Sequence, residues 1–268
     1  MNTFRHSGKL GDIIYSLPAV RALGGGFFYV DHVTQYLGKP ALGIHSARMM
    51  IELLETQDYI HRAALYGGEP VNYDLDRFRD KAFPVHVFNI IQAETDKAAG
   101  LLFGNLATDI RRRIIPKLEI DMAQFHWESI GLAGRADLDI PWMNGIPQKP
   151  IAEIVICKTS RYSGKLNWRG LKEYASRSVF VGMEEEWQAF RSAYFDVEFY
   201  KVCNLLDFAQ VVAGAKLYVG NQSFGLALAD AMLIPRVAEL GEPNPIRMSA
   251  IRAHNSLTQH VVEAYINS

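Results

Sequence analysis

The sequence is poor in cysteine and has no excess of either charge. Its 268 residues include 2 cysteines, and 28 basic residues nearly balance 29 acidic ones, for a formal net charge of −1. Cys157 and Cys203 stand alone, without the paired spacing or neighbouring histidines of a zinc site. Both lie in apolar, strand-like runs, so we expect small buried side chains. A catalytic or disulfide-bridging role for either cysteine is therefore disfavoured.

Long basic and long apolar runs are also missing. The densest basic cluster, the three arginines at 111–113, is typical of a solvated helix face, so we expect no nucleic-acid partner. No run approaches the roughly 18 apolar residues of a membrane span, and the N-terminus has no apolar signal core. We therefore expect a cytoplasmic protein. With 49% hydrophobic and 21% charged residues, the chain has enough apolar material for ordinary buried cores.

Two kinds of ligand motif are absent as well. The sequence has no His-Glu-x-x-His pattern, so no metal site is predicted. Residues 7–11 (S-G-K-L-G) lack the Gly-x-x-x-x-Gly-Lys-Ser/Thr frame of a P-loop, which disfavours an ATPase. We expect no cofactor.

What the chain does contain is a pair of similar segments near its two ends, residues 6–23 and 215–232. Each is typical of a strand, a tight polar or glycine-containing turn, and a helix. Such a turn directs backbone N–H groups and a helix N-terminus at one point, which favours an anion site. The pair predicts two Rossmann-like halves facing each other across a cleft, an arrangement suited to a diphosphate on one side and an acceptor on the other.

Between these segments, apolar runs and helical periodicity alternate, which predicts a parallel α/β sheet in each half. Pro18 is placed in the first two turns of its helix, where its missing N–H matters least. The predicted strands are 2–6, 27–30, 85–89, 153–157, 178–181, 197–200, 216–219 and 235–240. The predicted helices are 12–23, 46–54, 122–130, 184–193, 206–213, 225–232 and 257–266.

Residues 141–150 hold three prolines and a glycine, a composition typical of a linker. The strand and helix pattern begins again after it. We therefore expect an N-terminal Rossmann-like acceptor domain over 1–145, a C-terminal Rossmann-like nucleotide-sugar domain over 151–250, and a closing C-terminal helix over 251–268.

The residues of these elements resemble a known family. The run G-D-I-I-Y-S-L-P-A at 11–19 is followed by K-L-N-W at 165–168, V-G-M-E at 181–184, L-D-F at 206–208 and A-K-L-Y-V at 215–219. In this order they resemble glycosyltransferases of GT-B fold, closest to the ADP-heptose:lipopolysaccharide heptosyltransferases of family 9. The support is weakest between residues 38 and 124.

The resemblance implies an inverting, metal-independent transfer of sugar from a nucleoside-diphosphate sugar to a glycan or other hydroxyl acceptor, in cell-envelope polysaccharide biosynthesis. It leaves room for a peripheral position at the inner membrane surface. Asp12 is implied as the general base, and Lys165 as the cation that stabilises the leaving diphosphate. Gly11 and His6 are expected on the acceptor side. The residues expected to bind the nucleotide sugar are Ser160, Arg161, Ser163, Glu184, Gly220, Asn221, Gln222, Ser223 and Gly225.

Each assignment has a plainer alternative that the sequence leaves open. Asp12 could simply cap its helix, His6 could be a structural histidine or a rival base, and Lys165 could be solvated. Glu184 could bind ribose hydroxyls or belong to an ordinary acidic first turn. The glycine turn at 220–225 could hold the diphosphate or only close a strand–helix unit, and Trp168 is favoured as a core residue.

The sequence departs from the family after the predicted strand 216–219, where the family has Asp-Thr-Gly followed a few residues later by a histidine. This chain has Asn221, Gln222 and Ser223, with Leu226 at the position of the histidine. The loss of a carboxylate and an imidazole keeps open a non-catalytic sugar-nucleotide or glycan-binding protein. A two-domain sugar-nucleotide epimerase is a further alternative.

Overall fold

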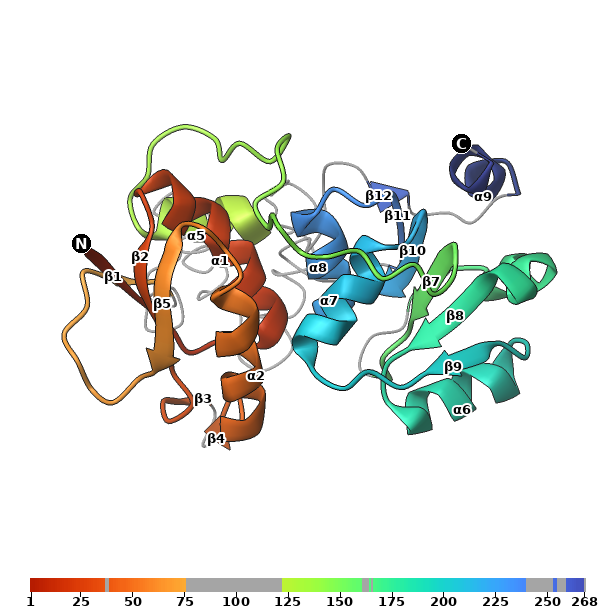
Figure 1. Ribbon diagram of the computed structural model, residues 1–268, viewed down its shortest axis with the longest axis horizontal. Coiled ribbons are helices and arrows are strands. Elements are labelled where there is room, and N and C mark those ends of the chain that lie inside the picture. The colour runs from red at the N-terminus through yellow and green to blue at the C-terminus, as the bar shows by residue number, and fades with distance from the viewer. Residues whose placement is uncertain are drawn as a thin grey trace, which may run out of the picture.

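The computed structural model describes residues 1–36, 39–75, 122–160, 164, 166–239, 253–254 and 259–267. Two parallel sheets lie side by side along the long axis of the molecule (Figure 1). The N-terminal sheet has the strand order β5-β2-β1-β6, and all its neighbouring strands are parallel. Its strands are β1 (Asn2–His6), β2 (Gly26–Val30), β5 (Ile60–Leu65) and β6 (Tyr73–Asp74). A separate antiparallel pair joins β3 (Gln35–Tyr36) to β4 (Lys39–Pro40).

The C-terminal sheet has the order β12-β11-β10-β7-β8-β9, again with parallel neighbours. Its strands are β7 (Ile154–Cys157), β8 (Ser178–Val181), β9 (Glu198–Tyr200), β10 (Leu217–Asn221), β11 (Arg236–Glu239) and β12 (Ala253–His254). The predicted mixed α/β architecture with parallel sheets is therefore confirmed.

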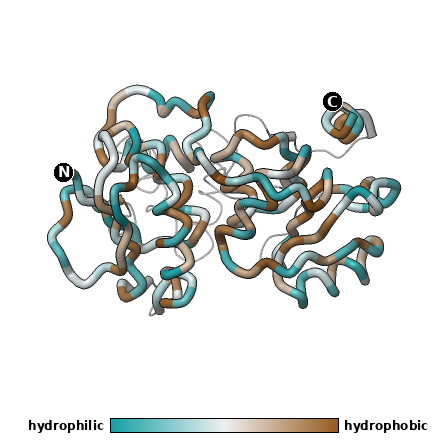
Figure 2. The backbone as a smooth tube through the Cα atoms, viewed as in Figure 1, coloured by the Kyte–Doolittle hydropathy of each residue, from teal (hydrophilic) through white to brown (hydrophobic). Residues whose placement is uncertain are grey.

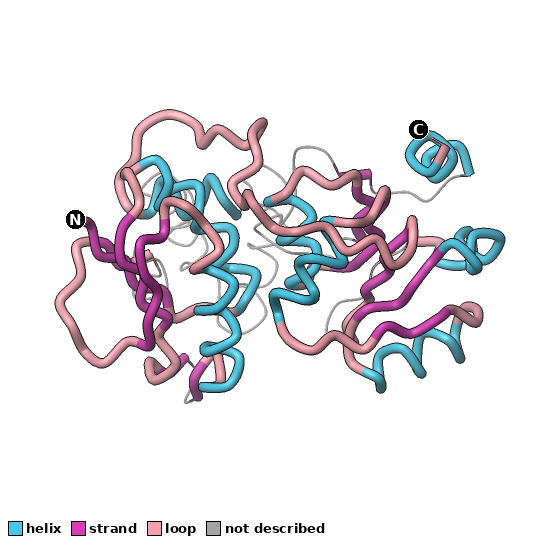
Figure 3. Tube along the Cα trace, in the orientation of Figure 1, coloured by secondary structure: helices cyan, strands magenta, loops and turns pink. Residues whose placement is uncertain are grey.

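Helices alternate with these strands along the chain (Figure 3). In the N-terminal half they are α1 (Leu10–Ala22), α2 (Ile44–Leu54) and α5 (Met122–Ser129). In the C-terminal half they are the 3₁₀ helix η3 (Trp168–Arg177), α6 (Glu184–Ala193), α7 (Leu205–Ala213), α8 (Phe224–Ala231) and α9 (Gln259–Ile266). Helix α6 begins and ends where the sequence predicts, and the predicted strand 85–89 lies outside the described residues.

Apolar side chains of the C-terminal strands alternate between two faces, as the period of a strand requires. Ile154 and Ile156 of β7 join a cluster with η3, α6 and α9. Val155 and Cys157 of the same strand join a second cluster with α7 and α8. Figure 2 shows the hydrophobic colouring that runs along these strands.

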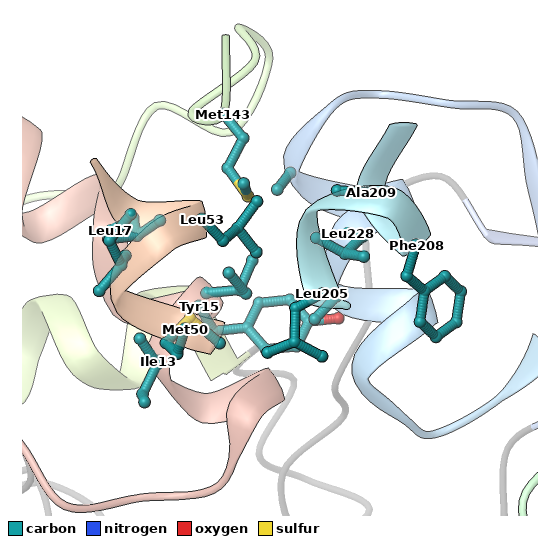
Figure 4. Close-up of a cluster of buried hydrophobic side chains, with 14 of the residues drawn as sticks. Ile13, Tyr15, Leu17, Met50, Leu53, Met143, Leu205, Phe208, Ala209 and Leu228 are labelled. Carbon is teal, nitrogen blue, oxygen red and sulfur yellow. The ribbon is translucent and has the colours of Figure 1, made fainter. Parts of the chain in front are cut away.

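The second cluster extends without interruption into the N-terminal half, where it includes buried side chains of α1 and α2. Helix α1 contacts α8, and α2 contacts α7. Figure 4 shows this contact, with Tyr15 and Met50 from the first half near Leu205 from the second. Burial of these apolar side chains removes them from water, which stabilises the contact between the halves.

Helix α1 is buried from Gly11 to Val20, which is typical of a helix enclosed on every side. Pro18 is its ninth residue and lies in the helix interior, so its expected position in the first two turns was wrong. A proline removes the N–H that would bond the carbonyl four residues earlier. That carbonyl, of Ile14, accepts a hydrogen bond from the Trp142 indole Nε1 at 3.1 Å. The linker thus satisfies the acceptor that Pro18 leaves open.

The linker is also hydrogen-bonded to the C-terminal half. The N–H groups of Trp142 and Met143 bond the Ala231 carbonyl of α8 at 3.0 and 3.2 Å. Further along, the Lys149 N–H bonds the Gln210 carbonyl at 3.0 Å, and Lys149 Nζ lies 2.8 Å from Asp207 Oδ1. The proline-rich segment is therefore an ordered strap.

Asp31, directly after β2, is fully buried and carries a dense set of hydrogen bonds. Its carboxylate accepts from Arg5 Nε at 2.8 Å, from the N–H groups of Val33 and Thr34 at 2.8 and 2.9 Å, and from the Thr34 hydroxyl at 2.6 Å. Burial alone would raise the pKa of Asp31, but the bonds from Thr34, Val33 and Arg5 outweigh it and lower the pKa. This carboxylate therefore fixes the end of β2 in its ionised form.

The pKa of Asp31 is lower in the folded chain than in the unfolded chain. Asp31 therefore stabilises the fold at any pH above the pKa of the unfolded chain, and this stabilisation is lost as the pH falls through the pKa of the folded chain. At pH 7 we expect Asp31→Asn to cost about 3 kcal/mol, since charge-assisted bonds are lost. The difference in unfolding free energy from the parent chain should narrow as the pH falls from about 4, the ordinary pKa of an aspartate in an unfolded chain, towards the lower pKa of folded Asp31. Urea unfolding of both chains at pH 7 and at pH 3 measures this, and a constant difference would contradict it.

Candidate functional site

The first turn, between β1 and α1, is organised by His6. The Gly8 N–H donates to His6 Nδ1 at 2.8 Å, and the His6 side chain is fully buried. Because Nδ1 accepts, the proton of the neutral ring lies on Nε2. A further proton would reach Nδ1 only if the Gly8 bond broke. This geometry favours a structural histidine over a rival base, while its acceptor-side role stays a prediction.

Asp12 is the third residue of α1, because the helix begins at Leu10 and so two residues earlier than predicted. Its Oδ2 accepts from the Lys9 N–H at 3.2 Å, which closes the first turn of the helix. The capping interpretation is therefore confirmed. It does not conflict with a role as base, since Asp12 keeps 9% of its surface exposed beside buried Gly11.

The second turn, between β10 and α8, is anchored by Asn221. Its Oδ1 accepts from the Thr159 N–H at 3.0 Å, and its Nδ2 donates to the Thr159 carbonyl at 2.7 Å. An aspartate could not donate to that carbonyl. The departure from Asp-Thr-Gly therefore has a physical reason: the amide joins the end of β10 to the loop after β7.

The glycines of this turn make room for a tyrosine. A Cβ on Gly220 would lie 2.3 Å from the Tyr218 hydroxyl, and one on Gly225 would lie 2.5 Å from the same oxygen. Tyr218 is fully buried, so its ring has nowhere to move. The glycine pattern thus has a packing origin, and its role in holding a diphosphate stays a prediction.

Gln222 and Ser223 complete the turn and are buried, with Ser223 as the N-cap residue of α8. The Cys157 sulfur lies 3.9 Å from the Ser223 hydroxyl oxygen. Burial raises the pKa of the Cys157 thiol to about 11, so it stays protonated and unreactive at neutral pH. Leu226, at the position of the family's histidine, is fully buried in α8.

These residues lie at the carboxyl edge of the six-stranded sheet. From β7 the chain proceeds to β8 on one side, whereas β10 pairs on the other side of β7. Such a reversal is a topological switch point, where open α/β sheets bind their ligands. The link between Thr159 and Asn221 spans this point.

The remaining predicted binding residues divide into two groups. Ser160 follows Thr159 and is exposed, and Glu184 is exposed at the start of α6, where Glu186 rather than Glu184 accepts the Met183 N–H at 3.3 Å. Arg161, Ser163 and Lys165 lie outside the described residues. Cys203 is exposed, so its expected burial was wrong, because it follows β9 in a loop at the sheet edge.

Sequence reasoning overlooked a charged group at the same edge. Lys158 Nζ lies 2.5 Å from Glu239 Oε2, and the Trp168 indole Nε1 donates to Glu239 Oε1 at 3.0 Å. The signal for Lys158 was a charge directly after the apolar strand 154–157. Trp168 is 1% exposed, which confirms its expected place in the core.

Within the part of the chain that the structure describes, no three His, Cys, Asp or Glu side chains gather as a metal-binding group. None of the described helices is long and apolar enough to span a membrane.

This arrangement defines a mixed α/β fold with parallel sheets, and the comparison with solved structures shows that the fold resembles that of family 9 glycosyltransferases. A glycosyltransferase of family 9 from Veillonella parvula DSM 2008 superposes with a TM-score of 0.52 at 10% identity, over 100% of this chain and 89% of the other. The predicted resemblance to family 9 is thereby confirmed as a likeness of fold.

Two further structures match less well. The E. coli heptosyltransferase WaaC with ADP-2-deoxy-2-fluoro heptose has a TM-score of 0.47 at 15% identity, over 100% of this chain and 99% of the other. The E. coli ADP-heptose lps heptosyltransferase II has a TM-score of 0.48 at 14% identity, over 96% and 89%. No protein-family model and no curated protein matches the sequence.

Proposed function

We propose that this protein is an inverting, metal-independent glycosyltransferase that moves a sugar from a nucleoside-diphosphate sugar to the hydroxyl group of a glycan or another acceptor. The observation that carries the proposal is the pair of strand–turn–helix units, β1–α1 and β10–α8, whose helices contact each other in a fold shared with a family 9 glycosyltransferase. Each turn ends at a helix N-terminus, which attracts anions.

In this proposal Asp12 removes the proton from the acceptor hydroxyl as its oxygen attacks the anomeric carbon. The bond between that carbon and the diphosphate oxygen breaks in the same step, and the configuration inverts. A carboxylate is ionised at neutral pH and can take the proton. Its position in the first turn of α1 favours the negative charge.

The diphosphate is proposed to lie at the C-terminal turn, near Gln222, Ser223 and the N-terminus of α8. Ser160 and Glu184 flank this edge as ligands for phosphate and ribose, and Arg161, Ser163 and Lys165 complete the proposed set. Fixed cations and backbone N–H groups would stabilise the departing charge electrostatically, in place of a metal ion.

We further propose that residues 1–145 bind the acceptor and 151–250 bind the nucleotide sugar, facing each other across a cleft. Cell-envelope glycan synthesis on the cytoplasmic side of the membrane is the setting that fits this role.

A second candidate is a non-catalytic sugar-nucleotide or glycan-binding protein. It is favoured by Asn221, whose amide is engaged with Thr159, and by Leu226, whose buried apolar side chain replaces the family's histidine. Such a protein would bind a donor without releasing its sugar.

A ligand panel separates these functions. ADP, GDP, UDP, CMP and their common sugar conjugates are added to the protein, with and without EDTA, and thermal unfolding is followed. We expect one diphosphate to stabilise the fold by about 2.7 kcal/mol at a hundredfold excess over its Kd, with no effect of EDTA. Incubation of its sugar conjugate with candidate glycans should then release the diphosphate.

The other outcomes are equally informative. Binding with no transfer or hydrolysis across the acceptors indicates the non-catalytic protein. A changed sugar still attached to its diphosphate indicates an epimerase. If no nucleotide stabilises the fold, the nucleotide-sugar proposal is wrong.

A further inference from the structure

Lys158 is held by two side chains that are far from it in the sequence. Its ammonium lies 2.5 Å from Glu239 Oε2 at the end of β11 and 5.2 Å from the centre of the Trp168 ring. The Trp168 indole bonds the other oxygen of the same carboxylate at 3.0 Å. Glu239 is therefore fixed from two sides, and it fixes Lys158 in turn.

The position of this group coincides with the switch point of the sheet. Lys158 is the first residue after β7, and its neighbour Thr159 is tied to Asn221 at the end of β10. Glu239 ends β11, the strand beyond β10. The carboxyl ends of β7, β10 and β11 are adjacent in the sheet, so Lys158 leaves β7 at the edge where a ligand of this fold would bind, and its ammonium lies over Trp168 on the face that η3 covers.

The two charges differ in their access to solvent. The Glu239 side chain is 2% exposed, whereas the Lys158 side chain is 16% exposed. The carboxylate therefore lies beneath, and the ammonium forms the outer part of the pair. An ammonium has three N–H donors, and Glu239 is the hydrogen-bond acceptor that the described residues provide for it. Donors remain to face a ligand at the edge.

An anion with several oxygens suits such a cation. A lysine on the surface must lose side-chain entropy when it binds, and a lysine already fixed by a carboxylate and an aromatic ring has lost much of it. Because the ammonium is the outer group of the pair, it lies closer to a ligand at the edge than Glu239 does, so its attraction for an anion exceeds the repulsion by the carboxylate, and the net attraction grows with the charge of the anion.

We propose that Lys158 binds the diphosphate of the nucleotide ligand, and that Glu239 and Trp168 are positioning residues that hold its ammonium at the sheet edge. This inference rests on the proposed function, because it assumes that a nucleoside diphosphate occupies this edge. It adds a cation to the site that is separate from Lys165.

The test measures the affinity of the protein for a nucleoside diphosphate by isothermal titration calorimetry. The probe is whichever of ADP, GDP and UDP binds the parent chain. Lys158→Met should weaken binding by about 10- to 100-fold, as expected for the loss of a charge-assisted bond. The free nucleoside should bind equally well to both chains. Lys158→Arg should retain most of the affinity for the diphosphate.

Lys201 provides a matched control. It is exposed and follows β9, the edge strand two places from β7, at the same carboxyl edge of the sheet. Lys201→Met removes the same charge, and we expect the affinity for the diphosphate to change by less than about twofold, since an exposed charge acts weakly at that distance.

Removing Lys158 leaves the buried Glu239 carboxylate without its positive partner, which can also impair folding. The variant Lys158→Met/Glu239→Gln removes both charges, so it leaves no unpaired charge, and it should fold and still lose the affinity for the diphosphate. If this double variant binds the diphosphate as tightly as the parent chain, Lys158 is structural and the inference is overturned. If the parent chain binds none of the three diphosphates, the proposed function itself fails.

Discussion

Replacing Asp12 by asparagine is expected to lower the rate of sugar transfer by about 100-fold or more, the usual effect of losing a general base. Asparagine keeps an oxygen that can accept the Lys9 N–H, so the first turn of α1 should remain closed. Its amide takes up no proton at neutral pH. The substitution therefore separates the chemical role of Asp12 from its capping role. The measurement is kcat for transfer from the donor identified by the ligand panel.

Two companion variants sharpen this result. Asp12→Ala also removes the cap, so it should lose about 1 kcal/mol of stability in addition to activity. Glu186 holds the equivalent third position of α6 and accepts the Met183 N–H in the same manner. Glu186→Gln makes the same acid-to-amide change and should transfer sugar at the parent rate. Full turnover by Asp12→Asn would remove Asp12 from the mechanism.

The largest expected loss of stability follows from replacing Arg236 by methionine. Arg236 in β11 forms an ion pair with Asp230 of α8, and both side chains are at most 6% exposed. The Tyr15 hydroxyl of α1 also donates to Asp230, so this group joins the two halves. Removing the arginine takes away a positive charge that neutralises a buried carboxylate, which typically costs about 3–5 kcal/mol. Guanidinium unfolding at pH 7 measures this cost.

An exposed pair supplies the comparison for this effect. Arg191 and Asp196 also form an ion pair, but their side chains are 51% and 73% exposed. Arg191→Met should therefore cost less than about 1 kcal/mol. In Arg236→Met/Asp230→Ala, the second change removes the buried charge and should restore part of the loss. An Arg236→Met chain as stable as Arg191→Met would show that the buried pair contributes little.

Much of the fold could be predicted from the sequence, because periodicity and turn residues mark elements locally. The strand β5 was overlooked because His61 and Arg62 interrupt its apolar run. The start of α1 was placed too late because Leu10 and Gly11 resemble a loop until the cap formed by Asp12 and Lys9 is known. In both places tertiary contacts, rather than the local sequence pattern, determine the secondary structure, and these contacts cannot be read from a single sequence.

The candidate site was harder to predict, since its partners are distant along the chain. Asn221 bonds Thr159 across 62 residues, and Lys158 pairs with Glu239 across 81. The sequence suggested Asn221 as a ligand because of its turn, but it contains no local signal that the amide joins two strand ends. The packing role of Gly220 likewise depends on how the Tyr218 ring folds back over the turn.

Pro18 has a consequence for how proteins of this kind can be recombined. The carbonyl that it leaves open on α1 receives the indole of Trp142, and the next N–H groups of the linker bond α8. The backbone hydrogen bond that Pro18 cannot make thus gives the linker an acceptor on α1, and the linker in turn connects α1 to α8. An N-terminal half taken from another protein would have to supply an apolar face that fits α7 and α8, and an unpaired helix carbonyl in the place of the Ile14 carbonyl. We therefore expect an exchanged half to fit only where these contacts of the linker are kept.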